Sequence, residues 1–130
     1  DNVGNVTEVI SEKIEIKDGF EISTPEEFQA METNLSGHYY VTKDIDMTDF
    51  NFTPIDGTFT GRIDGLGHTI SNLKMVDSNA TWTAIFKYIK GATIENIIFK
   101  DVNSYSIFAS TIAYQTIENN NTFSKVGVTR

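Results

Sequence analysis

The 130-residue sequence contains no cysteine and only two histidines. Disulfide frameworks, cysteine-based zinc sites and thiol nucleophiles are therefore excluded. His38 and His68 do not form the H-E-x-x-H pattern that a zinc peptidase needs. We expect no catalytic residue, no resident metal and no cofactor in this chain.

Basic residues are also scarce, with 10 lysines and arginines against 18 acidic residues and a net charge of -8. Such a balance disfavours nucleic acid as a partner. No apolar run approaches the roughly 18–20 residues of a membrane span, so we expect no membrane insertion. Because the chain begins at Asp1 rather than Met, we expect a piece of a larger protein with flanking domains.

The chain is predicted to comprise a lead-in segment, residues 1–19, in which residues 9–16 form a strand or an extended segment, and one module, residues 20–130. The clearest local signal is a helix start, with Thr24 as N-cap, Pro25 at the first helical position and Glu27 completing a capping box. The helix is predicted to run from Pro25 to Leu35, with one apolar face made by Phe28, Met31 and Leu35.

After the helix, short β-type runs alternate with Gly, Asn and Asp, at residues 39–41, 59–63, 68–75 and 94–99. Residues 67–75 and 91–99 share the pattern G-x-T-I-x-N, in which Ile70 and Ile94 hold the same position. The centre of the pattern recurs at Ile117, and the interval from Ile94 to Ile117 is nearly the same as that from Ile70 to Ile94. This interval falls within the period of roughly 20–50 residues that is typical of stacked architectures.

The repeat predicts an all-β fold, a short right-handed parallel β-helix (solenoid) with an N-terminal capping α-helix. Each repeat isoleucine should point inward and stack on its counterpart, while asparagine suits the corner because it tolerates left-handed backbone. We expect a buried stack of Ile70, Ile94 and Ile117, and a corner ladder of Asn72, Asn96 and Asn119. The helix should cover the open N-terminal end of the coil.

Residues 20–103 resemble the GLUG-type repeat modules of Gram-positive cell-surface and secreted proteins, and are similar to the N-terminal β-helix region of streptococcal immunoglobulin A1 protease-type zinc metallopeptidases. The resembling segments include S-T-P-E-E-F at 23–28, F-T-G-R-I-D-G-L-G-H-T-I-S-N-L at 59–73, and residues 35–47 and 84–96. The family usually has G-L-F-G where this chain has A-I-F-K at 84–87. The resemblance implies an extracellular or cell wall-associated bacterial protein.

Three groups of side chains are candidates for function. Asp44, Asp46 and Asp49 could gather oxygen ligands around calcium, although a solvated turn explains them better. Trp82, with Tyr88, Tyr105 and Tyr114 nearby in the sequence, could present aromatic faces to a glycan or protein, or could fill the coil. Carboxylates with a basic residue could cleave polysaccharides, and the candidates are Asp44, Asp46, Asp49, Asp56, Asp64 and Arg62.

The pattern favours a non-catalytic accessory module, either a rigid spacer or a binding surface for host protein or glycan, as in an adhesin. A first alternative is the substrate-positioning domain of a secreted immunoglobulin A1 protease-like zinc metallopeptidase. A second alternative is a polysaccharide-active β-helix enzyme.

Overall fold

The computed structural model describes residues 19–76, 81–105, 108–117 and 120–130. Most of its secondary structure consists of β-strands. With one short α-helix and one 3₁₀ turn, this part of the chain is all-β, as predicted. The lead-in residues 1–18, with the predicted strand or extended segment over 9–16, lie outside it. The elements are β1 (Phe20–Ile22), α2 (Pro25–Gln29), η1 (Ala30–Thr33), β2 (His38–Val41), β3 (Ile45–Asp46), β4 (Ile55–Phe59), β5 (Arg62–Asp64), β6 (Thr69–Ser71), β7 (Lys74–Val76), β8 (Trp82–Thr83), β9 (Phe86–Ile89), β10 (Thr93–Lys100), β11 (Asn103–Tyr105), β12 (Phe108–Ala109), β13 (Ala113–Thr116) and β14 (Thr122–Val128).

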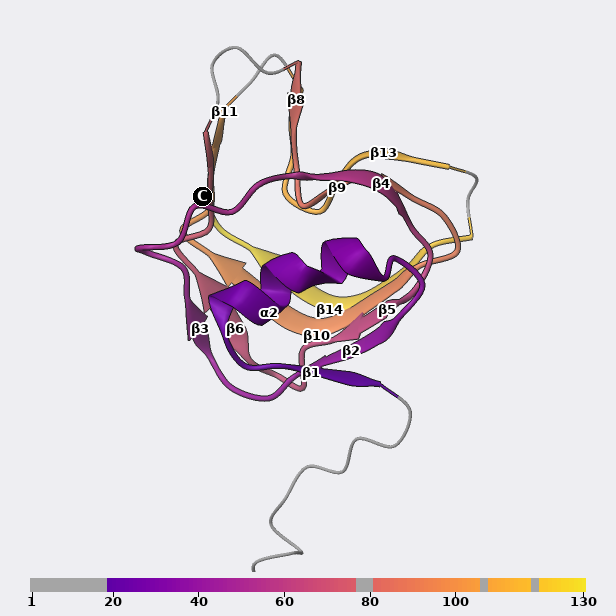
Figure 1. Ribbon diagram of the computed structural model, residues 1–130, viewed down its shortest axis with the longest axis horizontal. Coiled ribbons are helices and arrows are strands. Elements are labelled where there is room, and N and C mark those ends of the chain that lie inside the picture. The colour runs from indigo at the N-terminus through magenta and orange to yellow at the C-terminus, as the bar shows by residue number, and fades with distance from the viewer. Residues whose placement is uncertain (1–18, 77–80, 106–107, 118–119) are drawn as a thin grey trace, which may run out of the picture.

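All strand pairs in the described ranges are parallel, and a long stretch of chain separates the two strands of each pair. Tyr39 is paired with Ile63, Ile63 with Ile94, and Ile94 with Phe123. We call each turn of the chain over the preceding one a pass, and we count the passes from β1. The second pass holds β2–β4, the third β5–β9, the fourth β10–β13, and β14 opens the fifth (Figure 1).

The passes do not stack in the register that the repeat predicted. Ile94 lies beside Ile63, whereas Ile70 is paired with Phe99 in the second half of β10. The predicted stack of Ile70 on Ile94 is therefore wrong. Ile117 is also elsewhere, because its N–H donates to the carbonyl of Ile89 at 2.8 Å.

The two repeat asparagines do adopt left-handed backbone, as predicted, with φ of 59° at Asn72 and 56° at Asn96. They occupy different corners, however. Asn72 follows β6, whereas Asn96 lies inside β10, one residue after the position paired with Asp64. A single asparagine ladder is thus wrong, and Asn119 lies outside the described residues.

The interior of the stack is apolar and closely filled. Ile63, Ile70 and Ile94 are each at most 1% exposed. The rings of Phe59 and Phe86, on consecutive passes, stack at a centroid distance of 4.4 Å. Burial of such side chains is the main stabilising contribution to a fold of this kind.

Replacing Ile94 with alanine should therefore lower the free energy of unfolding by about 2–5 kcal/mol, since the side chain is lost from a filled core. Ile98 is the matched control, because it lies in the same strand and is 44% exposed. Urea unfolding of the two variants tests the assignment. Equal losses in Ile94→Ala and Ile98→Ala would contradict it.

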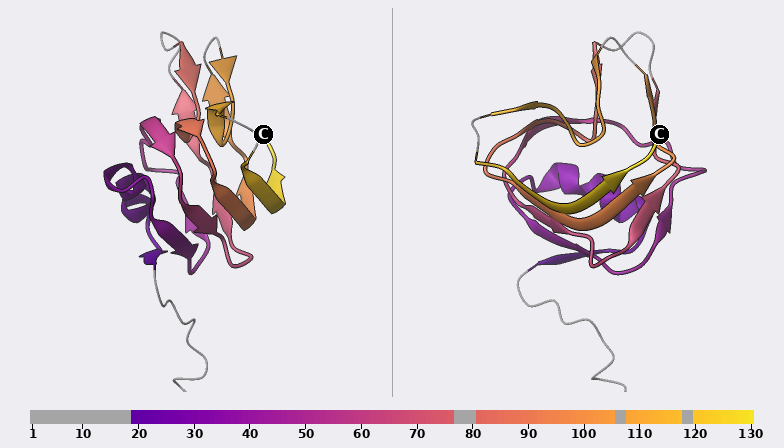
Figure 2. Two further views of the ribbon diagram at one scale, coloured as in Figure 1. Left: turned by 90° about the vertical axis from the view of Figure 1, so that its right-hand side faces the viewer. Right: turned by 180° about the vertical axis from the view of Figure 1, so that it is seen from behind.

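The helix lies across one end of the stack, with β14 at the opposite end (Figure 2). Thr24 Oγ1 accepts a hydrogen bond from the N–H of Glu27 at 3.1 Å, and the Glu27 carboxylate accepts one from the N–H of Ser23 at 2.7 Å. The Ser23 N–H also lowers the pKa of Glu27. Phe28 and Met31 are fully buried, as predicted.

The helix is shorter than predicted. The α-helix ends at Gln29 and continues as a 3₁₀ turn to Thr33, so Leu35 lies beyond it. Leu35 still packs, partly buried, against the core. In the described ranges, no helix is long and apolar enough to cross a membrane.

A projection interrupts the third and fourth passes and stands away from the wound body (Figure 1). It contains the parallel pairs β7 with β11 and β8 with β12. Because the third pass forms the first half of the projection, the chain from Ile63 to its partner Ile94 is longer than that from Tyr39 to Ile63. The projection places β8 close to the start of β9.

Candidate functional site

Three aromatic side chains meet where the projection joins the body. They come from separate strands, Trp82 from β8, Tyr88 from β9 and Tyr114 from β13. The Trp82 and Tyr114 rings are 6.1 Å apart between centroids and inclined by 26°. Those of Tyr88 and Tyr114 are 6.5 Å apart. We call these residues, with Lys87, the aromatic corner.

The strand register explains why these side chains meet. Phe86 and Ile89 are buried, which leaves Lys87 and Tyr88 between them on the outer surface. Phe86 is paired with Ala113, so the next residue, Tyr114, lies beside Lys87 on the following pass. Parallel stacking thus gathers residues that are far apart in the sequence.

Lys87 contacts two of the three rings. Its Nζ is 5.9 Å from the Trp82 ring centroid and 5.6 Å from that of Tyr88, within the range of a cation–π contact. On the preceding pass, Asp56 Oδ1 lies 3.9 Å from the same nitrogen. The Asp56 side chain is 77% exposed, so this is a surface ion pair and adds little stability.

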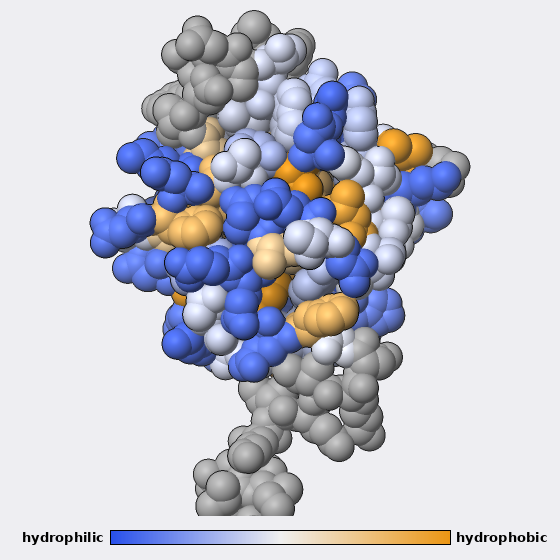
Figure 3. Space-filling model, in the orientation of Figure 1, coloured by the Kyte–Doolittle hydropathy of each residue, from blue (hydrophilic) through white to orange (hydrophobic). Residues whose placement is uncertain are grey.

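The aromatic corner combines apolar faces with polar groups that remain within reach of solvent. Trp82, Lys87, Tyr88 and Tyr114 are all partly exposed. Figure 3 shows weakly polar residues, drawn pale, over the region of β8 and β9. Such a surface can contact the apolar face of a ligand while its ammonium, carboxylate and phenol groups bind polar atoms.

The sequence comparisons agree with part of the resemblance noted above. No family model matches the chain, and no solved structure matches it significantly. The chain is similar to the immunoglobulin A1 protease of Streptococcus sanguinis. The two are 32% identical over an alignment of 84 residues that covers 58% of this chain and 4% of the protease.

The chain therefore spans a small fraction of the length of that curated relative, and the similarity supports a loose relation to one region of it. The finer assignment to GLUG-type modules stays a prediction.

Two of the three aspartates proposed as calcium ligands, Asp44 and Asp46, join consecutive passes. Asp44 Oδ1 accepts a hydrogen bond from the N–H of Thr69 at 2.9 Å and lies 3.1 Å from His68 Nδ1. These contacts, the Thr69 bond first, lower the pKa of Asp44. Asp46 Oδ1 accepts from the N–H of Thr48 at 3.0 Å.

Asp46 Oδ1 also accepts from the side-chain amide of Asn72, at 2.9 Å. In the part of the chain that the structure describes, no three acidic or histidine side chains are grouped to hold a metal ion. Calcium binding by Asp44, Asp46 and Asp49 stays a hypothesis.

The carboxylate of Asp46 should make stability depend on pH. Hydrogen bonds from the Thr48 hydroxyl, then from Asn72, lower its pKa below the usual 3.8. A lowered pKa in the folded state stabilises the fold above the unfolded pKa, and this contribution disappears as pH falls through the folded value. Asp46→Asn should therefore destabilise the chain at neutral pH, and the difference from wild type should shrink below pH 3.8.

Urea midpoints of wild type and Asp46→Asn at both pH values measure this effect. Asp49→Asn removes an equal charge from the same segment and serves as the control. A destabilisation by Asp46→Asn that stays constant with pH would contradict the assignment.

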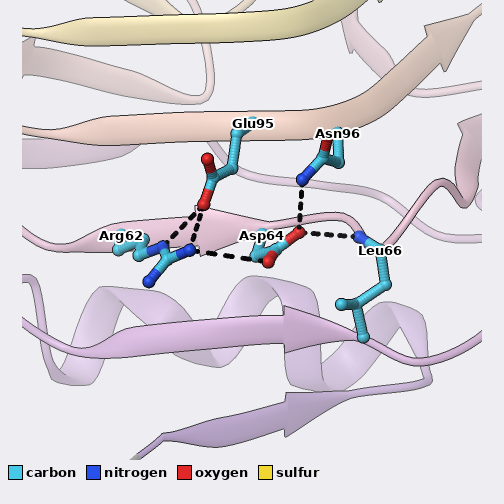
Figure 4. A network of polar contacts seen from close by, with 5 residues as sticks. All are labelled: Arg62, Asp64, Leu66, Glu95 and Asn96. Carbon is cyan, nitrogen blue, oxygen red and sulfur yellow. Dashed lines mark hydrogen bonds and ion pairs between the residues drawn. The ribbon is translucent and has the colours of Figure 1, made fainter.

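Of the residues proposed for polysaccharide cleavage, Arg62 and Asp64 lie together in a second network on β5 and β10 (Figure 4), and the structure does not bring the other four aspartates into it. Arg62 Nε donates to Glu95 Oε2 at 2.8 Å, and an Arg62 terminal nitrogen lies 3.6 Å from Asp64 Oδ2. The bond to Glu95 raises the pKa of Arg62. Asp64 Oδ1 accepts from the N–H of Leu66 at 3.0 Å and from the Asn96 amide at 3.1 Å.

The contacts of Asp64 repeat those of Asp46. In each case one aspartate oxygen accepts two hydrogen bonds. One comes from the backbone N–H two residues later, and the other from the side-chain amide of an asparagine with left-handed backbone on the next pass. This arrangement fixes the two corners of the wound chain, which gives both carboxylates a structural role.

Sequence reasoning identified Trp82, Tyr88 and Tyr114 but missed Lys87 and Asp56 as members of the same surface. The side chain of Tyr105, considered with them, lies outside the described residues. Lys87 directly precedes Tyr88, yet only the register of β4, β9 and β13 shows that Asp56 and Tyr114 flank it. Glu95, the partner of Arg62, was missed for the same reason.

Proposed function

We propose that this chain is a non-catalytic accessory module of an extracellular multidomain bacterial protein, and that the aromatic corner binds a host protein or glycan. The observation that carries the proposal is the convergence of three aromatic rings from β8, β9 and β13, two of which contact the Lys87 ammonium group. Aromatic residues are enriched among the side chains that dominate binding energy.

The scaffold in this proposal is a short right-handed parallel β-helix, capped at its N-terminal end by α2 and η1. The exclusively parallel pairing of the described strands supports it, as do the paired corners at Asp46 and Asp64. The right hand follows from the strong preference for right-handed crossovers between parallel strands. A wound scaffold of this kind holds surface side chains rigidly, which lowers the entropic cost of binding.

Equilibrium binding of the chain to immobilised gastric mucin and to purified immunoglobulin A1 tests the proposal. Trp82→Ala should weaken binding by at least about tenfold, as truncation of a central aromatic anchor does. Phe20→Ala is the matched control, because Phe20 is an exposed aromatic residue of β1, outside the aromatic corner. Absence of binding to both probes, or equal affinities of Trp82→Ala and wild type, would contradict the proposal.

A second candidate function is the positioning of substrate for a protease, which the similarity to the immunoglobulin A1 protease favours. The test uses the full-length parent protein with an intact substrate and with a short peptide carrying the cleaved bond. Trp82→Ala should raise KM for the intact substrate while kcat is unchanged, and should leave cleavage of the peptide unaltered. Equal effects on both substrates would exclude this function.

The non-catalytic character is itself testable. Wild-type chain incubated with polyuronides and other polysaccharides should release no products. Turnover that is lost in Asp64→Asn or Asp46→Asn would overturn the proposal in favour of a polysaccharide-active enzyme.

A further inference from the structure

We infer that the ligand of the aromatic corner is a neutral pyranose sugar within a glycan, bound by its apolar face. The inference rests on the proposed function and narrows its partner to one chemical class. It depends on the geometry of the rings, on the polar groups around them and on the local charge.

The rings supply flat apolar surface. Trp82 and Tyr114 are inclined by only 26°, and both are partly exposed. A pyranose presents a face of C–H groups that carry partial positive charge, while an aromatic face carries partial negative charge. Sugar rings therefore pack against tryptophan and tyrosine rings, which offer much contact area at a small entropic cost.

The polar groups at the corner suit hydroxyls, which both donate and accept hydrogen bonds. The Lys87 ammonium supplies donors, and the Asp56 carboxylate, 3.9 Å away, supplies acceptors. The two tyrosine hydroxyls of the corner can do either. Thr58 and Gln115, which are paired with Tyr88 on the neighbouring passes, add polar groups at the rim.

The local charge favours a neutral sugar over an acidic one. Lys87, the cation of the corner, is paired with Asp56, so its positive charge is compensated. The whole chain carries a net charge of -8, which repels sulfated or sialylated glycans. Among the described residues, the polar Thr58 and Gln115 flank Tyr88 on the neighbouring passes, in contrast to the apolar surroundings typical of a protein-binding centre.

Trp82 is the single tryptophan of the sequence, so its fluorescence reports directly on this site. The chain is titrated at millimolar concentrations of methyl β-galactoside, methyl β-glucoside, methyl α-mannoside, chitotriose and, as the acidic arm, 3′-sialyllactose. We expect a saturable change of emission with at least one neutral sugar. Tyr114→Ala should weaken that binding by about tenfold, and Phe20→Ala should leave it unchanged.

Lys87→Met retains the aliphatic stem but removes the donors, and should also weaken binding, whereas Lys87→Arg should restore part of it. Circular dichroism of each variant verifies that the fold is retained. A saturable response to 3′-sialyllactose alone would overturn the inference.

Mucin before and after enzymatic removal of its glycans separates the inference from the proposed function. Loss of Trp82-dependent binding on deglycosylation supports both. If that binding persists on the deglycosylated protein and no sugar alters Trp82 emission, the proposed function stands and the inference fails. If neither mucin form nor immunoglobulin A1 binds and no sugar alters emission, both fail.

Discussion

Gly61→Ala is expected to lower the free energy of unfolding by roughly 3–5 kcal/mol, at the upper end of single substitutions. A Cβ at Gly61 would lie 2.0 Å from the carbonyl oxygen of Gly37 on the preceding pass. That oxygen accepts a hydrogen bond from the N–H of Arg62, so relief of the clash would separate β2 from β5. The two passes thus lie too close together at Gly61 for a side chain to fit.

Gly67→Ala is the matched control for this prediction. Its φ of +84° disfavours a side chain, but no atom lies within 4 Å of the added Cβ. The expected loss is only about 1–2 kcal/mol, from backbone strain alone. Urea unfolding compares the two variants, and a Gly61→Ala chain no less stable than Gly67→Ala would contradict the stacking of β5 on β2.

Disruption of the helix at the end of the stack should have an effect at least as large. Phe28 and Met31 are fully buried against the end of the stack, so the double variant Phe28→Ser/Met31→Ser should cost at least about 5 kcal/mol. The free edge and apolar interior left behind would associate with other copies. We expect loss of stability together with aggregation, measured by thermal unfolding and light scattering.

Thr24→Ala provides the control for the cap, because it should cost only about 1 kcal/mol and leave the chain monomeric. A second variant, in which residues 24–34 are replaced by a glycine-serine linker, tests the same point without polar substitutions in the core. Monomeric behaviour of this variant at an unchanged melting temperature would show that the helix is no cap.

Elements that depend on local sequence signals were predicted correctly, whereas the register in which distant strands pair was not. The capping box at Thr24 and the left-handed asparagines depend on a few neighbouring residues, and both were found. The T-I-x-N pattern encodes an inward isoleucine followed by a bend, but the chain bends in this way at more than one corner. Asn72 and Asn96 look equivalent in sequence although they serve different corners.

The number of residues in each pass could not be predicted from the sequence either. The projection adds residues between Ile63 and Ile94, so the alignment of Ile70 with Ile94 matched two bends of different corners instead of two equivalent positions. The aromatic corner depends on that same register, which is why its aromatic members could be identified individually while Lys87 and Asp56 were missed.

A nuclear Overhauser spectrum of the purified chain tests the central claim, that consecutive passes stack in the observed register and thereby assemble the aromatic corner. The account predicts cross-peaks from Ile94 to Ile63, from Ile70 to Phe99 and from the Trp82 indole to the Tyr114 ring. Cross-peaks between Ile70 and Ile94, with none between Trp82 and Tyr114, would contradict it.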